Sequence, residues 1–439
     1  MRIEIQDKKQ FIDMFNILYP NNKISKINGL SIDSRKITKG DIFFPIKGNK
    51  YDGHKFITKS LGKGAIISFS KNKNNNKKII TVKSIKNEIN KLAKNWLKIS
   101  KSKIIGITGS NGKTTAKNLL YHILSNKYKC NKTIGNYNSL IGFPLSFLAS
   151  KLDSKYNILE YGASKPHEIK KLCEIISPDY SLITNVSNAH IKNYKSFDQL
   201  YDTKYEIYSS TKSDGTIFIN TDQFEIKKSI QDKRIKSFRF SKKIKIENNY
   251  LIINNKKISI PEEIIYLKDI ILSIYIITHY LGITNKSFEN SLKSFNPSNG
   301  RGNYILYKNH KIIDDSYNAN PNSVNFAINR FSNIKNIGKK IFILGDMLEL
   351  GDIEIEEHNK LAKSFNMSDI DVILTYGKIS ENIHKYISKK KYSKHYYNKK
   401  NLKIELNNLI CKNDIVYLKG SRSMKLESLY KGDIWFIYY

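Results

Sequence analysis

Residues 104–115 carry the side chains and the spacing of a phosphate-binding loop. A β-branched run ends at Thr108 and a helical pattern of apolar residues follows, so the order is strand, loop and helix. The loop and the first helical turn read Gly109, Ser110, Asn111, Gly112, Lys113, Thr114 and Thr115. Glycines let backbone amides approach an anion, and the amino end of a helix attracts negative charge. We predict that Lys113 contacts the β- and γ-phosphates of a nucleotide and that Thr114 or Thr115 contacts Mg²⁺.

The loop is shorter than the full G-x-x-x-x-G-K-T motif, because Ile107 stands where the first glycine would be. What remains is T-G-x-x-G-K-T-T. The alternative is an ordinary glycine-rich turn with a solvated lysine. We give it less weight, since strand, loop and helix all fall where phosphate binding needs them.

Two further strands end near residues that could hold a metal ion. The apolar segment 156–160 ends at Glu160, and the apolar segment 179–186 runs into His190. The carboxyl ends of parallel strands gather at the ligand crevice of a sheet, so we predict that both side chains lie near the nucleotide. A polar surface residue is the alternative for His190.

Polar loops elsewhere could contact a substrate. Asn138 and Ser139 lie in the loop 135–144, which opens a helix. Near the glycine turns of the first hundred residues, the candidates are Ser34, Arg35, Lys47 and Gly48. These residue types could hold a diphosphate or a sugar nucleotide. Ordinary polar turns in a small α/β domain are the alternative.

Strand and helix patterns alternate along the chain, which predicts an α/β fold with parallel sheets. A length of 439 residues predicts two or three domains. We place a small N-terminal α/β domain at 1–98, a central P-loop domain that binds ATP on a parallel sheet at 99–299, and a Rossmann-like α/β domain at 300–439. Residues 238–261 are typical of a β-meander with Asn-Asn turns. The last domain has no phosphate loop of its own, so it would supply a lid or a second substrate site.

The composition excludes several classes of function. The net charge is +36, but 68 lysines stand against 7 arginines along the whole chain. Base reading and bidentate phosphate contacts favour arginine, so we interpret the charge as a compositional bias and expect no nucleic-acid partner. Three isolated cysteines predict neither a disulfide framework nor a zinc site, which fits a reduced cytoplasm. The most apolar segment, 270–283, is too short to span a membrane and predicts a buried helix.

Seven motifs, in this order, resemble those of the Mur ligases of peptidoglycan synthesis. They are T-G-S-N-G-K-T-T (108–115), G-N-Y-N-S-L-I-G-F-P (135–144), L-E-Y-G-A-S-K-P (159–166), T-N-V-S-N-A-H (184–190), D-D-S-Y-N-A-N-P (314–321), G-D-M-L-E-L-G (345–351) and K-G-S-R-S (419–423). The fifth and sixth are the most discriminating. They resemble the branch that joins D-alanyl-D-alanine to UDP-N-acetylmuramoyl-tripeptide.

The resemblance implies an ATP-dependent amide ligase that works through an acyl phosphate. It implies that the first domain binds the nucleotide-sugar end of the acceptor, the second binds ATP and Mg²⁺, and the third closes over them. Sister ligases that add a diamino acid, and folylpolyglutamate-type ligases, remain alternatives of the same mechanism. A nucleotide-dependent switch, or a basic nucleic-acid binder that uses ATP, is the alternative from another class. We expect a monomer.

The resemblance also assigns residues one by one. It implies that Glu160, His190 and Thr114 bind Mg²⁺. It further implies that Lys204 is carbamylated to a metal-bridging carboxylate, although the helical pattern of 196–210 alone predicts an ordinary solvated lysine. The residues implied to act from the third domain are Asp315, Asn318 and Asn320 near the nucleotide, Arg301 at the hinge, and Arg422 at the substrate.

Two positions depart from the family pattern. The helix at 266–283 lacks the G-x-H-x-x-x-N pattern often found there, which leaves the adenine contacts open. Position 205 is Tyr where the family commonly has Gly.

Overall fold

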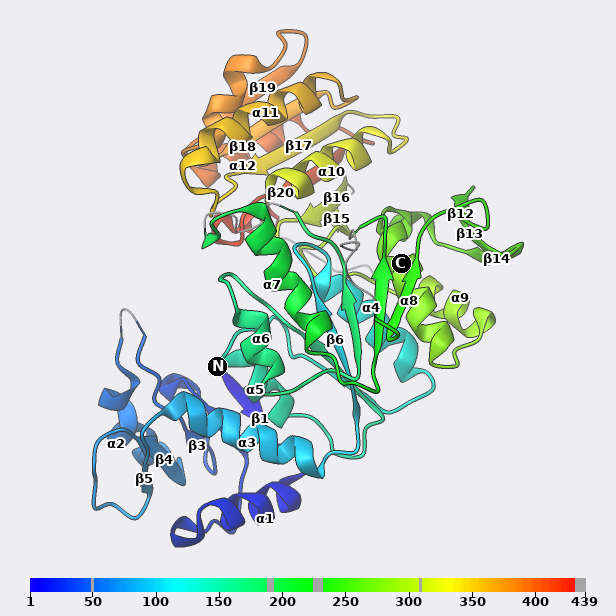
Figure 1. The fold of residues 1–439 in the computed structure, drawn as a ribbon. Coiled ribbons are helices and arrows are strands. Elements are labelled where there is room, and N and C mark those ends of the chain that lie inside the picture. The colour runs from blue at the N-terminus through cyan, green and yellow to red at the C-terminus, as the bar shows by residue number, and fades with distance from the viewer. Residues whose placement is uncertain (49–50, 188–192, 224–231, 308–309, 431–439) are drawn as a thin grey trace.

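The computed structural model describes residues 1–48, 51–187, 193–223, 232–307 and 310–430. Three large sheets, each covered by helices, follow one another along the chain (Figure 1). Most of their strands run parallel, so the predicted α/β class is confirmed.

The first sheet has the order β1-β2-β3-β4-β5. Its strands are β1 (Arg2–Glu4), β2 (Gly29–Ser31), β3 (Ile42–Phe43), β4 (Ile67–Ser70) and β5 (Ile79–Thr81). The helices beside it are α1 (Lys8–Leu18), α2 (Ile57–Gly62) and α3 (Ile85–Ile99). Helix α3 begins where the Ser84 side chain accepts a hydrogen bond from the Asn87 amide, and it buries a stripe that ends at Trp96.

The central sheet is wholly parallel, in the order β11-β10-β9-β6-β8-β7. Its strands are β6 (Lys103–Thr108), β7 (Cys130–Lys132), β8 (Tyr156–Glu160), β9 (Tyr180–Ile183), β10 (Thr216–Asn220) and β11 (Ile235–Phe238). Strand β6 lies between β8 and β9, so the strand order reverses beside it. That is where an open parallel sheet binds its ligand.

Helices cover both faces of the central sheet. They are α4 (Lys113–Ser125), α5 (Gly142–Leu148), α6 (Glu168–Cys173), α7 (Phe197–Ser209), α8 (Lys268–Tyr280) and α9 (Asn285–Lys293). Helix α8 confirms the buried helix predicted from the apolar segment 270–283. Among the described residues, no helix combines the length and the apolar character that crossing a membrane requires.

The predicted meander is an antiparallel sheet that extends from the central unit (Figure 1). It contains β12 (Ile244–Glu247), β13 (Tyr250–Ile253) and β14 (Lys256–Ser259). The turns are Asn248-Asn249 and Asn254-Asn255, and all four residues have positive φ. Asparagine tolerates this conformation, which matches the right-handed twist of the two strands it joins.

The third sheet has the order β15-β16-β20-β17-β18-β19, with β15 antiparallel to β16 and the others parallel. Its strands are β15 (Asn303–Tyr307), β16 (His310–Asp315), β17 (Lys340–Gly345), β18 (Val372–Tyr376), β19 (Tyr392–Tyr396) and β20 (Ile415–Lys419). Its helices are α10 (Pro321–Ser332), α11 (Glu354–Asn366) and α12 (Lys399–Leu409). The sequence predicted β16, β17, β18 and β20 but missed the two edge strands.

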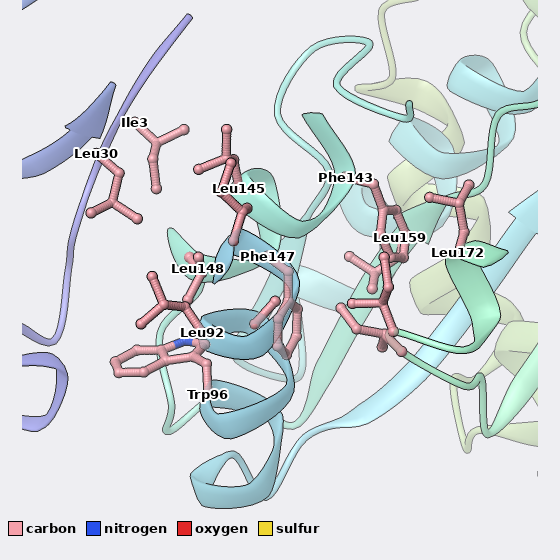
Figure 2. Close-up of a cluster of buried hydrophobic side chains, with 14 of the residues drawn as sticks. Ile3, Leu30, Leu92, Trp96, Phe143, Leu145, Phe147, Leu148, Leu159 and Leu172 are labelled. Carbon is pink, nitrogen blue, oxygen red and sulfur yellow. The ribbon is translucent and has the colours of Figure 1, made fainter. Parts of the chain in front are cut away.

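One apolar core runs from the first sheet to the central sheet without a break (Figure 2). Leu92 and Trp96 of α3 pack with Phe147 and Leu148 of α5, and the Trp96 indole N–H donates to the Ser150 carbonyl at 3.3 Å. The third sheet has separate cores on its two faces. The predicted boundaries at 98 and 299 remain a prediction, since α3 shares its core with the central unit.

Replacing Trp96 with Ala should lower the free energy of unfolding by about 3–5 kcal/mol, because a large buried side chain is lost and a cavity remains. Denaturant unfolding of the full chain measures this. The matched control is Ile17→Ala, since the Ile17 side chain is 80% exposed. Equal effects of the two substitutions would contradict a shared core at the junction.

Candidate active site

The phosphate loop runs from the end of β6 to the start of α4, as predicted. Gly109 and Gly112 have φ values of 145° and 78°. A Cβ atom at Gly109 would lie 2.1 Å from the Thr184 hydroxyl, and one at Gly112 would lie 2.9 Å from the Ile270 side chain. Backbone conformation therefore favours glycine at both positions, and at Gly109 a side chain also lacks space, because the Asn185 backbone lies 3.0 Å from the same Cβ position.

The segment after β9 holds this loop in place. The Asn111 amide donates to the Asn185 side chain at 3.0 Å, and the Thr184 hydroxyl donates to the Asn111 carbonyl at 2.5 Å. The Ser110 hydroxyl donates to the Ser187 carbonyl and accepts from the Ser187 amide, both at 2.9 Å. The T-N-V-S motif thus shapes the phosphate loop from the neighbouring strand. His190, predicted to follow it at the metal, lies outside the described residues.

Lys113 folds its side chain back over the loop. Its ammonium donates to the Gly109 carbonyl at 2.7 Å and to the Ser110 carbonyl at 3.1 Å. Burial lowers the pKa of Lys113, and the Glu160 carboxylate opposes that shift. A lysine held inside a loop of backbone amides is placed to contact a bound phosphate.

The structure brings Glu160 together with two other predicted residues. Glu160 ends β8 and is 2% exposed. Its Oε2 accepts from the Thr114 hydroxyl at 2.9 Å, and its Oε1 accepts from the Asn138 amide at 2.7 Å. A carboxylate and a hydroxyl beside a phosphate loop are the oxygen ligands that Mg²⁺ uses together with nucleotide phosphates. The donor set therefore fits a magnesium ion.

Sequence reasoning missed a fourth member of this cluster, Lys117. Its ammonium lies 3.3 Å from Glu160 Oε2. The available signal was its place on α4, one turn after Lys113 and between the buried residues Ala116 and Leu119. The Ser139 hydroxyl accepts from the Gly142 amide at the start of α5, and its contact with substrate remains a prediction. Thr115 is buried at 7% exposure.

Lys204 is buried, so the expectation of a solvated helical lysine is wrong. It is 2% exposed, and its ammonium donates to the Ala163 carbonyl at 3.3 Å, three residues after Glu160. Burial, with a smaller contribution from the charge of Lys113, lowers the pKa of Lys204 to about 7. A large share of the side chain is then the neutral amine at neutral pH, which is the form that reacts with CO₂.

Asn320 of the third unit, which lies between β16 and α10, reaches the phosphate loop. Asn320 caps α10, and its amide donates to Asn111 Oδ1 at 2.7 Å. Asp315 and Asn318 are held by Lys419 instead: its ammonium lies 2.8 Å from the Asp315 carboxylate and 2.9 Å from the Asn318 carbonyl. The D-D-S-Y-N-A-N-P loop therefore contacts the P-loop through its last asparagine.

Two arginines stack on tyrosines where the central and third units meet. The Arg301 guanidinium lies 3.8 Å from the centre of the Tyr317 ring, and that of Arg330 lies 3.4 Å from the centre of the Tyr266 ring. The Tyr266 hydroxyl also donates to the Arg301 carbonyl at 3.0 Å. Arg330 was not predicted, since its sequence neighbours form an ordinary amphipathic helix.

Comparison with known proteins identifies the family. Residues 26–103 match "Mur ligase family, catalytic domain", residues 107–284 match "Mur ligase middle domain", and residues 300–422 match "Mur ligase, glutamate ligase domain". The UDP-N-acetylmuramoyl-tripeptide:D-alanyl-D-alanine ligase of Bacillus subtilis is 30% identical over 94% of each chain. This chain belongs to the Mur ligase family.

Other relatives agree with this assignment. The ligase of the same name from Buchnera aphidicola is 33% identical over 92% of each chain. The structure of MurF ligase from Thermotoga maritima in complex with ADP is similar with a TM-score of 0.78 and 28% identity, over 91% of this chain and 95% of that one. A MurF structure from Acinetobacter baumannii shares the fold, with a TM-score of 0.83, 23% identity, and 97% and 98% of the two chains covered.

The remaining predicted residues of this Mur ligase lie away from the Glu160 cluster. Ser34 and Arg35 lie in a short 3-10 helix (Ser34–Lys36) of the first unit, and Lys47 and Gly48 follow β3, where Lys47 forms an isolated bridge with Asp52. The Arg35 side chain is 86% exposed and forms two 2.9 Å hydrogen bonds with the Asp33 carboxylate. In the third unit, Arg422 pairs with Glu427 at 2.7 Å. Their proposed substrate contacts remain predictions.

Lys204 should carry a carbamate in bicarbonate buffer. With ¹³C-bicarbonate, a carbamate carbon signal should appear in the NMR spectrum and should grow as the pH rises through about 7, because only the neutral amine reacts. The signal should be absent from Lys204→Arg, which keeps the charge and cannot form it. A spectrum of the wild type that matches the arginine variant would contradict the carbamate.

Removing the Arg330 stack should loosen the junction of the second and third units. Arg330→Ala should lower kcat/KM by roughly 5- to 30-fold, since a desolvated cation–π contact contributes about 1–2 kcal/mol. Steady-state kinetics measure this, with the exposed Arg239→Ala as control. Unchanged kinetics in Arg330→Ala would show that the stack does not matter for turnover.

Proposed function

We propose that this chain is the ATP-dependent ligase that joins D-alanyl-D-alanine to UDP-N-acetylmuramoyl-tripeptide and releases ADP and phosphate. The observation that carries the proposal is the Asn320–Asn111 contact, which brings the motif most specific to that branch onto the phosphate loop. The similarity to ligases of that name over 94% of the chain supports it.

Forming the amide requires an activated carboxyl group, and the site is built to activate it with ATP. The acceptor carboxylate attacks the γ-phosphorus, the bond to ADP breaks, and an acyl phosphate forms. Lys113 and the loop amides stabilise the charge that moves onto the phosphate oxygens. The amine of the dipeptide then attacks the acyl carbon, phosphate leaves, and a proton is released. No side-chain nucleophile is needed.

Glu160 and Thr114 would hold Mg²⁺, and we propose His190 and a carbamate on Lys204 as further ligands. A bound Mg²⁺ supplies positive charge against the phosphate oxygens. Asn138 orients the Glu160 carboxylate through the 2.7 Å hydrogen bond to Oε1. The Lys204 ammonium donates to the carbonyl of Ala163, in the segment that follows Glu160, so a carbamate there would supply a second carboxylate near that segment.

We propose that the UDP end of the acceptor binds to the first unit and that the peptide groups of the substrates contact the third unit. The segments with Ser34, Arg35, Lys47 and Gly48 would hold the UDP portion of the acceptor. Arg35 would exchange its Asp33 partner for a diphosphate, which guanidinium binds in the same bidentate way. Arg422 would contact the incoming dipeptide or the acceptor peptide. We propose that the reaction takes place in the cytoplasm, because it uses ATP and a nucleotide-linked acceptor.

A crossed assay tests the reaction. Candidate UDP-muramyl peptides are combined with candidate amines, and ADP formation is measured for each pair. Turnover is expected with the tripeptide and D-alanyl-D-alanine together. Turnover with the dipeptide acceptor and a diamino acid would instead identify a sister ligase, and slow ATP hydrolysis independent of both substrates would identify a switch.

Lys113→Ala should reduce turnover at least 100-fold while leaving the melting temperature close to that of the wild type, because it removes a cation aimed at the phosphates. The assay above measures the loss. Full activity in Lys113→Ala would show that residues 109–115 do not act as the phosphate-binding loop. Lys101→Ala is the control, since that lysine is exposed and precedes the strand that leads into the loop.

A further inference from the structure

Lys117 is a cation sealed inside the central unit. It lies on the inner side of α4 and is 1% exposed. Moving an ammonium group out of water is costly unless it is paired and fully hydrogen-bonded. Neither the phosphate loop nor the predicted ligands account for a lysine at this position.

The Lys117 ammonium has three acceptors from two different segments. It donates to the Gly135 carbonyl at 2.6 Å and to the Thr133 carbonyl at 3.1 Å, and it lies 3.3 Å from Glu160 Oε2. An ammonium group has three N–H donors, so this environment uses all of them. The positive charge of lysine and its three donors therefore match the one carboxylate and two carbonyls around this site.

The acceptors belong to the elements that build the metal and substrate site. The segment 133–135 leads into Asn138, which holds Glu160 Oε1 at 2.7 Å. The Thr133 hydroxyl accepts from the Glu160 backbone amide at 2.8 Å. A Cβ atom on Gly162 would lie 2.6 Å from the Asn138 side chain, so the amide has little room to move. Lys117 therefore joins α4, the loop 133–138 and the end of β8 around one carboxylate.

Two roles for this cation predict opposite effects on Mg²⁺ binding. If Lys117 only balances the charge of Glu160, its removal leaves a more negative site and should strengthen Mg²⁺ binding. If it orients the carboxylate and the loop, its removal should weaken Mg²⁺ binding, because outer partners of a metal ligand control its geometry. Thr114 and Asn138 already donate to Glu160, which leaves less need for a mere counter-charge.

We propose that Lys117 is a positioning residue: its ammonium locks the Glu160 carboxylate and the loop that carries Asn138 into one unit, which holds the metal and the acceptor in register with the phosphate loop. The metal part of this proposal depends on nucleotide binding alone. The acceptor part rests on the proposed ligase function.

The test is a Mg²⁺ titration of ADP binding by calorimetry, which needs no ligase substrate. Lys117→Met keeps the apolar stem and removes the cation. It should weaken the Mg²⁺-dependent part of ADP binding by about 10- to 100-fold, as expected for loss of a partner that orients a metal ligand. Unchanged or tighter Mg²⁺ dependence would overturn the proposal.

Lys117→Arg keeps the positive charge but changes the geometry of the donors. It also provides the test if Lys117→Met does not fold. Its planar fork keeps the positive charge but does not reproduce three donors that diverge from one atom. It should also weaken the Mg²⁺-dependent binding, whereas a titration like that of the wild type would overturn the proposal. The matched control is Lys132→Met, a half-buried lysine of β7 that lies over the Tyr121 ring.

A double-mutant cycle shows whether Lys117 acts through Glu160. With Glu160→Gln already present, adding Lys117→Met should change Mg²⁺-dependent ADP binding less than about twofold, because the carboxylate it orients is gone. If Lys117→Met weakened Mg²⁺-dependent ADP binding as much in the Glu160→Gln background as in the wild type, the proposal would be overturned. If the wild type binds ADP with Mg²⁺ but forms no amide, the ligase function fails while this cycle still decides the role of Lys117.

Discussion

The buried carboxylate of Glu160 is the constraint on which the rest of the site depends. Its two oxygens are held by Thr114 from the phosphate-loop helix and by Asn138 from the following loop, and Lys117 lies against one of them. A carboxylate at 2% exposure is tolerated only because it is paired and hydrogen-bonded in this way. The same contacts fix the orientation of the carboxylate beside the phosphate loop.

The order of the strands in the central sheet brings the Glu160 carboxylate next to the phosphate loop. Strand β6, which carries the phosphate loop, lies directly between β8 and β9. Glu160 at the end of β8 and Thr184 after β9 therefore flank the loop from both sides. A parallel sheet that reverses its strand order beside β6 places three strand ends around one phosphate site.

The two junctions between the units differ in physical character. The first unit shares a continuous apolar core with the central sheet, so it is fixed by burial of side chains such as Trp96. The third unit meets the centre through the Asn320–Asn111 hydrogen bond and the Tyr266–Arg330 stack. Polar and stacking contacts of this kind can be exchanged with water at lower cost, which suits a unit that must admit and release substrates.

The sequence by itself determined the phosphate loop, the α/β class, the buried helix α8 and the Asn-Asn turns of the meander. Each depends on local backbone preferences or on periodicity within a single element. The resemblance in motifs also led to the family. The edge strands β15 and β19 were missed, because most of their residues are only partly buried or exposed and so lack the continuous apolar pattern of the inner strands.

Only the tertiary structure decided which charged side chains are buried. By helical pattern Lys204 was a surface lysine, yet packing leaves it 2% exposed with a pKa near 7. The roles of Lys117 and Arg330 likewise depend on partners from other elements. Lys117 pairs with Glu160, and Arg330 stacks on Tyr266. A lysine or arginine looks the same in the sequence whether its side chain is solvated or buried. The difference comes from desolvation and from charges brought near by distant strands, which no local pattern contains.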